Sequence, residues 1–431
     1  MPYTVTRFVS LALFALSFFF CAAVSSEERP LDTIPLSGEW SFRMDPGDAG
    51  VEEGWFNAAL PDKVTLPGAM TDYGFGEDIT AETKWTGTVV SPMWHQEERF
   101  APYREPGNTK ILFWLQPEKH YVGPAWYQRD VEVPETFANR RVVLVLERCH
   151  WETRVWVDGV EAGMRNSLST PHEYDLTALL PPGKHTLALR MDNSLKIAVG
   201  ENAHSVSDNT QGNWNGVIGK MALEARPKVW VDDLQVYPNV HDKSARVAVT
   251  VANAMGAPAS GTLTLTAALE NGGAPDAIAP VALPFDAQGA SVSLEATVPL
   301  GNSAPLWSEF TPALMVMTAT LDSGGGTDTA TVDFGLREFG AKGTQFTTNG
   351  QPIFLRGTLE CCIFPKTGYP PTDVDSWRRV MRALKAHGLN ELRFHSWCPP
   401  EAAFQAADRE GVYFQIECPA WAKIGDGETI D

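Results

Sequence analysis

Short runs in which apolar and polar residues alternate cover the chain from residue 31 to about residue 229. Alternation with a period of two is typical of strands that bury one face. The clearest runs are Arg141–Leu146, Arg154–Val157 and His185–Arg190, and the pair Asp158-Gly159 supplies a turn between strands. Strands this short, separated by Gly, Pro and Asn, predict an antiparallel β-sandwich over 31–229.

A second region, 230–340, alternates in the same way but has a different composition. Ala245–Ala252 and Ser291–Val298 are its most regular runs, and the region contains no histidine after His241. It is rich in Ala, Gly, Thr and Val and contains no catalytic constellation. We predict a small immunoglobulin-like sandwich that acts as a spacer.

Beyond residue 340 the pattern changes to alternating strands and helices. Pro352–Thr358 predicts a strand, and Val374–His387 predicts an amphipathic helix that Asp373 can cap. Asn390–Phe394 and Val412–Glu417 predict two further strands with a second helix between them. This order is typical of the beginning of a parallel α/β fold. Three strands cannot close a barrel, so we expect residues 341–431 to form an incomplete one.

The N-terminus has the pattern of a secretory signal. Arg7 precedes an apolar run, Phe8–Val24, and small residues before Ser26 offer a cleavage site. We therefore expect a signal peptide at 1–25 and a secreted or periplasmic protein that has no membrane partner after cleavage. The alternative is an uncleaved membrane anchor, although the apolar run is a little short for a full span.

Composition narrows the classes of partner. Lys and Arg total 34 against 53 Asp and Glu, and the formal net charge of -19 disfavours nucleic acid and anionic membranes. We expect most of the fourteen tryptophans to pack in β-sheet cores, but their number also favours a carbohydrate partner, because indole faces stack on sugar rings. No Cys or His spacing is typical of a zinc site, and we predict no metal and no cofactor. Homo-oligomerisation stays open.

Seven segments stand out as a set because of their order and spacing. They are Leu36–Phe42 (LSGEWSF), Gly123–Arg129 (GPAWYQR), Val155–Gly159 (VWVDG), Asn213–Gly219 (NWNGVIG), Asn349–Gly357 (NGQPIFLRG), Leu389–Arg393 (LNELR) and Gln415–Glu417 (QIE). Together they resemble the glycoside hydrolases of family 2, the β-galactosidase and β-glucuronidase group. The resemblance extends over nearly all of the chain that follows the predicted signal.

The resemblance implies a multidomain architecture. Its parts are a sugar-binding jelly-roll β-sandwich at 31–229, an immunoglobulin-like β-sandwich at 230–340 and the start of a (β/α)₈ TIM barrel at 341–431. It also implies hydrolysis of O-glycosidic bonds in glycans, in carbohydrate catabolism, by a retaining mechanism with two Glu residues. In the family both Glu residues end later barrel strands, so we expect neither of them within this chain. The alternative function is carbohydrate binding without catalysis.

Active-site residues of such barrels gather at the C-terminal ends of the strands. Arg393 matches the family's strand-two Arg, which orients the nucleophile carboxylate. The alternative is a structural ion pair between Arg393 and either Glu417 or Glu360. Glu417 matches a supporting acidic position of the family, and Glu360 at the end of the first strand is a further candidate for substrate binding or active-site support. His395 and Trp397 follow Arg393 and are candidates for contact with the sugar.

The first sandwich offers a polar loop that relatives extend towards the substrate. Asp208, Asn213 and Trp214 are its candidate residues for contact with sugar hydroxyls. The alternative is ordinary turn chemistry, which Asp and Asn provide in any loop.

The cysteines at the strand ends depart from the family pattern, and they also lead us to expect a disulfide. Cys361 and Cys362 stand where the family tends to carry His, which leaves a galactosidase-type subsite and its metal without support. Loss of Cys21 with the signal would leave an odd number of cysteines. Because adjacent parallel strands bring their ends together, we expect a disulfide from Cys361 or Cys362 to Cys398 or Cys418.

Overall fold

The computed structural model describes residues 33–83, 92–111, 115–200, 203–206, 212–271, 278–324, 326–419 and 421–423. The predicted signal and Asp208 lie outside these ranges. Within them, no helix is both long and apolar enough to cross a membrane.

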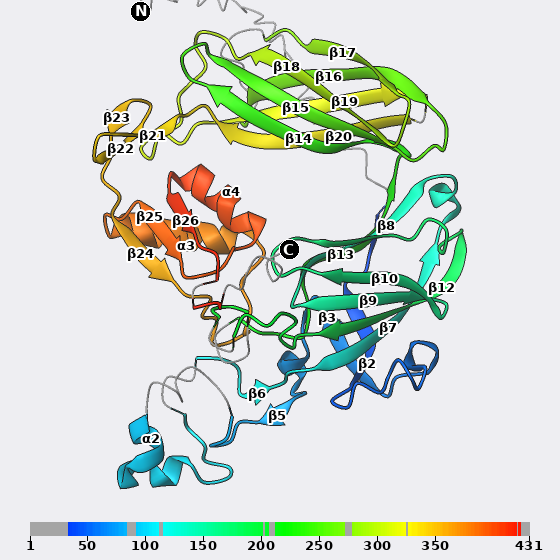
Figure 1. Ribbon diagram of the computed structural model, residues 1–431, viewed down its shortest axis with the longest axis vertical. Helices are drawn as coiled ribbons and strands as arrows, with labels where there is room; N and C mark the ends of the chain where they lie inside the picture. Colours follow the sequence, from blue (N-terminus) through cyan, green and yellow to red (C-terminus); the bar gives the residue numbers. More distant parts are fainter. Residues whose placement is uncertain are drawn as a thin grey trace, which may run out of the picture. The chain divides into compact units, whose positions relative to one another are not determined.

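Residues 33–226 form two antiparallel sheets (Figure 1). One sheet contains β1 (Thr33–Pro35), β4 (Gly68–Ala69), β8 (Arg141–Cys149), β11 (His172–Asp175) and β13 (Gly216–Arg226). The other contains β2 (Gly38–Met44), β3 (Asp62–Leu66), β7 (Pro124–Val133), β9 (Glu152–Val157), β10 (Val160–Asn166) and β12 (Gly183–Asp192). Between β4 and β7 the chain carries the paired strands β5 (Glu77–Asp78) and β6 (Lys119–His120) and the short helix α2 (Pro92–Gln96).

The two sheets share one apolar core. Trp40 of β2 and Tyr127 of β7 are buried together with Leu144 of β8 and Leu223 of β13. Burial of each such side chain stabilises the fold by about 1.5–3 kcal/mol. The alternation seen in the sequence therefore places the apolar residues of both sheets in a common interior.

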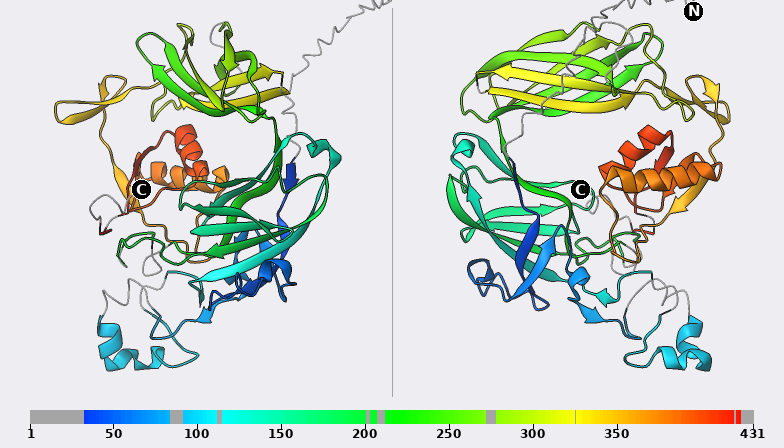
Figure 2. Two further views of the ribbon diagram at one scale, coloured as in Figure 1. Left: turned by 45° about the vertical axis from the view of Figure 1, so that its right-hand side comes forward. Right: turned by 180° about the vertical axis from the view of Figure 1, so that it is seen from behind.

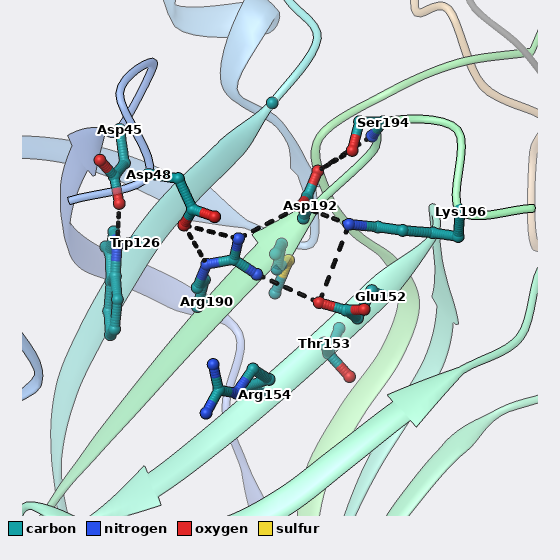
Figure 3. Close-up of polar contacts among 12 residues, drawn as sticks. Asp45, Asp48, Trp126, Glu152, Thr153, Arg154, Arg190, Asp192, Ser194 and Lys196 are labelled. Atoms are coloured by element: carbon teal, nitrogen blue, oxygen red, sulfur yellow. Dashed lines mark hydrogen bonds and ion pairs between the residues drawn. The ribbon is translucent and has the colours of Figure 1, made fainter. Parts of the chain in front are cut away.

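A cluster of charged residues lies at one end of β12 in the first sandwich (Figure 3). The Arg190 guanidinium contacts Asp48 at 2.7 Å, Glu152 at 3.1 Å and Asp192 at 3.2 Å. Lys196 also forms an ion pair with Asp192. Burial disfavours the charge on Asp192, but the hydrogen bonds from Lys196 and Ser194 lower the pKa of its carboxyl group below the ordinary value.

Residues 229–335 form a second pair of antiparallel sheets, which Figures 1 and 2 show as two layers. The first sheet contains β14 (Val229–Asn239), β15 (Ser244–Asn253) and β18 (Ser291–Pro299). The second contains β16 (Ala259–Leu269), β17 (Val281–Ala287), β19 (Leu314–Ser323) and β20 (Gly326–Gly335). Alternate residues such as Val247 and Val249 of β15 pack against Leu265 of β16 and Met317 of β19.

The chain then forms an α/β segment. A small antiparallel sheet of β21 (Phe339–Lys342), β22 (Gln345–Thr348) and β23 (Gln351–Pro352) precedes it. The segment contains β24 (Gly357–Glu360), α3 (Val374–Ala386), β25 (Glu391–Phe394), α4 (Glu401–Glu410) and β26 (Tyr413–Ile416). The three strands are parallel, in the order β24–β25–β26. The predicted order of strands and helices is therefore present.

The first strand of this segment begins later than the sequence predicts. The expected strand was Pro352–Thr358, whereas β24 begins at Gly357. Ile353 and Leu355 instead pack against a cluster that contains Trp307 of the second sandwich. Their apolar side chains therefore pack against the second sandwich and do not belong to the parallel sheet.

Hydrogen bonds join the second sandwich to the α/β segment. Trp307 Nε1 donates to the Asp408 carbonyl at 2.8 Å, and Asn390 Nδ2 donates to Glu309 Oε2 at 2.8 Å. Asn390 directly precedes β25, so this contact fixes the start of the central strand against the sandwich.

Candidate functional site

The register of the parallel strands sets which side chains meet at their C-terminal ends. Glu360, Phe394 and Ile416 are aligned across β24, β25 and β26. Leu392 and Phe394 are buried under α3 and α4, so Arg393 between them points from the opposite face of the sheet. The residues that follow each strand therefore emerge at one edge.

A cavity of about 250 Å³ lies at this edge. The strand ends contribute Cys362, Ser396, Trp397 and Glu417 to its walls, and the first sandwich contributes Arg148, His150, His204 and Trp214. Two of the predicted strand-end residues, Trp397 and Glu417, and one predicted sandwich residue, Trp214, thus line a common space.

Arg393 forms an ion pair with Glu417. Its Nε donates to Glu417 Oε1, and Ser396 Oγ donates to Glu417 Oε2 at 3.0 Å. The Arg393 hydrogen bond, helped by that from Ser396, lowers the pKa of the Glu417 carboxyl group. Of the two carboxylates expected beside Arg393, this one is its partner.

Glu360 has a different role. Its carboxylate accepts from Trp397 Nε1 at 2.6 Å and from the Cys362 backbone at 3.0 Å. Burial raises the pKa of Glu360 despite these hydrogen bonds. Glu360 therefore fixes the indole of Trp397 at the cavity wall.

His395 contacts the cavity wall indirectly. Its ring packs against that of His204, with 4.5 Å between centroids. Burial, followed by the neighbouring His395, lowers the pKa of His204. Neutral His204 is consequently favoured, and one of its ring nitrogens is a hydrogen-bond acceptor.

The predicted residues of the sandwich loop separate from one another. Trp214 is buried against His150, with 5.1 Å between ring centroids. Asn213 instead exchanges hydrogen bonds with Asn193, at 2.7 Å in one direction and 3.3 Å in the other. Asn213 therefore braces the loop, and Asp208 is not among the described residues.

Sequence reasoning missed Arg148 and His150. Arg148 is 6% exposed and its Nη2 donates to the Cys398 carbonyl at 2.6 Å. Burial, followed by the charge of Arg148, lowers the pKa of His150 to about 3. The signal in the sequence was limited: Glu147–His150 directly follow the apolar run Arg141–Leu146, which marks the end of a strand but does not show what these side chains face.

The expected disulfide is absent from the described region, where all five cysteines are free thiols. Cys362 is buried and its sulfur faces Gly212 of the first sandwich, where an added Cβ would lie only 2.5 Å away. The thiol thus packs against the first sandwich. Burial also raises the pKa of Cys362 well above its ordinary value, which disfavours a thiolate nucleophile.

No cluster of three or more His, Cys, Asp or Glu side chains suited to a metal ion occurs in the part of the chain that the structure describes. The titratable groups of the cavity are instead held by hydrogen bonds, ion pairs and ring contacts.

Comparison with known proteins gives a consistent result. Residues 229–337 match the family model for glycosyl hydrolases family 2. The resemblance to family 2 is confirmed. A β-galactosidase of Arthrobacter sp. (strain B7) is 24% identical over 400 residues, which cover 90% of this chain and 35% of that protein.

Solved structures of a β-glucuronidase have a similar fold. A β-glucuronidase from Ruminococcus gnavus in complex with D-glucuronic acid has a TM-score of 0.65 at 20% identity, covering 90% of this chain and 60% of that chain. The complex of that enzyme with uronic isofagomine has a TM-score of 0.65 at 20% identity, covering 90% of this chain and 58% of that chain. The chain therefore spans 35% of the β-galactosidase and about three fifths of the β-glucuronidase.

Proposed function

We propose that this protein is the N-terminal part of a secreted or periplasmic family 2 glycoside hydrolase, with residues 341–431 beginning its (β/α)₈ barrel. The observation that supports this most is the position of the cavity. It lies at the C-terminal ends of parallel strands, where barrel enzymes hold their substrates. The first sandwich completes its wall through Trp214 and Arg148.

The reaction would be hydrolysis with retention, which requires two carboxyl groups about 5–5.5 Å apart. Glu360 and Glu417 do not suit these roles. Glu417 is held by Arg393 and Ser396, and Glu360 is held by Trp397. We assign the acid/base and the nucleophile to later barrel strands.

Arg393 would then act on the nucleophile through its planar guanidinium. Its Nε donates a hydrogen bond to Glu417, and its terminal nitrogens can donate to a second carboxylate. A lysine cannot reproduce this fork. The side chain is 44% exposed, which leaves room for such a partner.

The test compares this chain with a longer form that includes complete barrel strands. Nitrophenyl β-galactoside and β-glucuronide are the first substrates, followed by other β-glycosides. We expect turnover only in the longer form, and Arg393→Lys in it should lower kcat by about 100-fold or more, because transition-state interactions are lost. Turnover by the 431-residue chain that survives repurification, or a near-normal kcat for Arg393→Lys, would contradict the proposal.

A second candidate is carbohydrate binding without catalysis. The wall residues Trp214 and Trp397 favour it, since both tryptophans line a space the size of about one sugar ring. Calorimetric titration of the chain with galactose, glucose and glucuronate separates this candidate from simple inactivity.

A further inference from the structure

Arg148 is a buried cation without a counter-ion among the described residues. It lies next to last in β8 and is 6% exposed. Within the described ranges its polar partner is the neutral carbonyl of Cys398, and its Nε has no hydrogen-bond partner there. A guanidinium offers five N–H donors, and burial without an opposite charge is costly.

The nearby carboxylates are engaged elsewhere. Glu417 lines the same cavity but forms an ion pair with Arg393. Glu360 accepts from Trp397, whose ring lies 5.7 Å from the Arg148 guanidinium carbon. Glu147 accepts from the Lys220 backbone and lines a different cavity. None of the three is within ion-pair distance of Arg148.

The same wall carries further buried polar atoms. Trp214 Nε1 makes no hydrogen bond within the described residues. The ring nitrogens of His150 make none of ordinary geometry there, although the backbone of Ser205 and of His150 itself lies close enough to favour the charged ring. An indole N–H can only donate, and a neutral imidazole donates through one nitrogen. Together with Arg148 Nε, these atoms make the wall rich in donors. Such donors pair best with an acceptor that carries negative charge.

We propose that this cavity binds an oxyanion carried by a sugar, namely a carboxylate or a sulfate ester. Arg148 supplies the opposite charge, and Trp214 Nε1 and His150 supply neutral hydrogen bonds. The cavity volume of about 250 Å³ limits the guest to about one sugar ring or its substituent. The proposal rests on the carbohydrate-binding function proposed above and adds the charge of the ligand to it.

The experiment is calorimetric titration of the 431-residue chain at constant ionic strength in a buffer free of sulfate and phosphate. Two matched pairs are compared, glucuronate against glucose and glucose 6-sulfate against glucose. We expect the anionic member of at least one pair to bind about tenfold more tightly, since charge-assisted hydrogen bonds are roughly twice as strong as neutral ones. The pair that shows the preference identifies the carboxylate or the sulfate as the group recognised.

Arg148→Met should abolish the preference for the anionic sugar over its neutral counterpart. Arg154→Met is the matched control, because Arg154 forms an ion pair with Glu161 on β10 and does not line the cavity. If Arg148→Met does not fold, Trp214→Phe keeps a ring and removes one donor. It should weaken anion binding by about threefold to tenfold.

Outcomes separate this proposal from the one on which it rests. Equal affinity for neutral and anionic sugars, or a preference that persists in Arg148→Met, overturns the anion site while carbohydrate binding stands. Absence of any sugar binding, together with absence of sulfate binding, overturns both. Binding of inorganic sulfate that Arg148→Met abolishes supports the anion site even if every sugar fails.

Discussion

Two arginines near the strand ends are in contrasting electrostatic situations. Arg393 is 44% exposed and has Glu417 as its partner, whereas Arg148 is 6% exposed and, among the residues that the structure describes, has a neutral carbonyl in place of a counter-ion. The sequence resemblance pointed to Arg393, because that position has a family counterpart. Arg148 was not predicted, since its importance depends on which carboxylates the fold leaves out of reach. Local sequence does not contain that information.

The first residue-scale prediction concerns the Arg393–Glu417 pair. Arg393→Met should raise the pKa of Glu417 towards its ordinary value of about 4.3, because the main hydrogen bond that lowers it is lost. Since the folded-state pKa is lowered, the pair stabilises the protein above pH 4.3 and stops doing so as pH falls through the folded value. NMR titration of ¹³C-labelled Glu measures this. Arg154→Met is the control. If the pKa of Glu417 is the same in Arg393→Met as in the unmodified protein, Arg393 is not the main cause of its low value.

A second prediction concerns the Arg190 cluster of Figure 3. The side chains of Arg190 and Asp192 are 5% and 6% exposed, so Arg190→Met leaves buried acidic groups with fewer cationic partners. We expect the free energy of unfolding to fall by about 3–5 kcal/mol, as for other broken buried pairs. Arg154→Met, which removes a more exposed pair, should cost about 1 kcal/mol or less. Urea unfolding of both variants tests the contrast, and equal losses would argue against it.

At the scale of elements, local signals predicted α3 and failed at the start of β24. Asp373 caps α3 as expected, with its carboxylate accepting from Ser376 N at 2.7 Å, and the apolar face of the helix buries Trp377. Both signals act within one helix, so the sequence contains them. The sequence pattern predicts Ile353 and Leu355 to be strand residues, but in the structure they pack against the cluster that contains Trp307. Periodicity cannot distinguish these two uses of an apolar residue.

The cap of α3 gives a prediction at this scale. Asp373→Ala should lower the free energy of unfolding by about 1 kcal/mol, because the Ser376 N–H loses its acceptor. Asp373→Asn keeps a capping oxygen and should cost less. Thermal and urea unfolding measure both variants. A loss for Asn equal to that for Ala would show that the charge of Asp373, and not its cap, is responsible.

At the scale of the whole molecule, Glu309 of the second sandwich contacts several parts of the α/β segment. Its side chain accepts from Asn390 at 2.8 Å, and its backbone carbonyl accepts from Lys385 Nζ at 2.9 Å. The end of α4 approaches the same place through Gly411. These contacts connect the sandwich to both helices of the α/β segment. We therefore expect the cavity at the strand ends to depend on a sandwich whose described residues do not line it.

Substitution of Gly411 tests this dependence. Gly411 follows α4 with φ +71°, and a Cβ there would lie 2.5 Å from the Glu309 carbonyl oxygen. Gly388 follows α3 with φ +76° and has no atom within 4 Å of such a Cβ. Gly388→Ala should therefore cost only backbone strain of about 1–2 kcal/mol. Gly411→Ala must in addition displace a carbonyl of the sandwich.

We expect Gly411→Ala to lower the midpoint of urea unfolding clearly more than Gly388→Ala does. We also expect it to weaken the sugar binding proposed for the cavity, because displacement of α4 shifts the strand ends that it packs against. Gly388→Ala should leave that binding unchanged. Unfolding followed by circular dichroism and calorimetric titration gives both readouts. If the two variants behave alike, the contact at Glu309 does not position the site, and the α/β segment holds its geometry without the second sandwich.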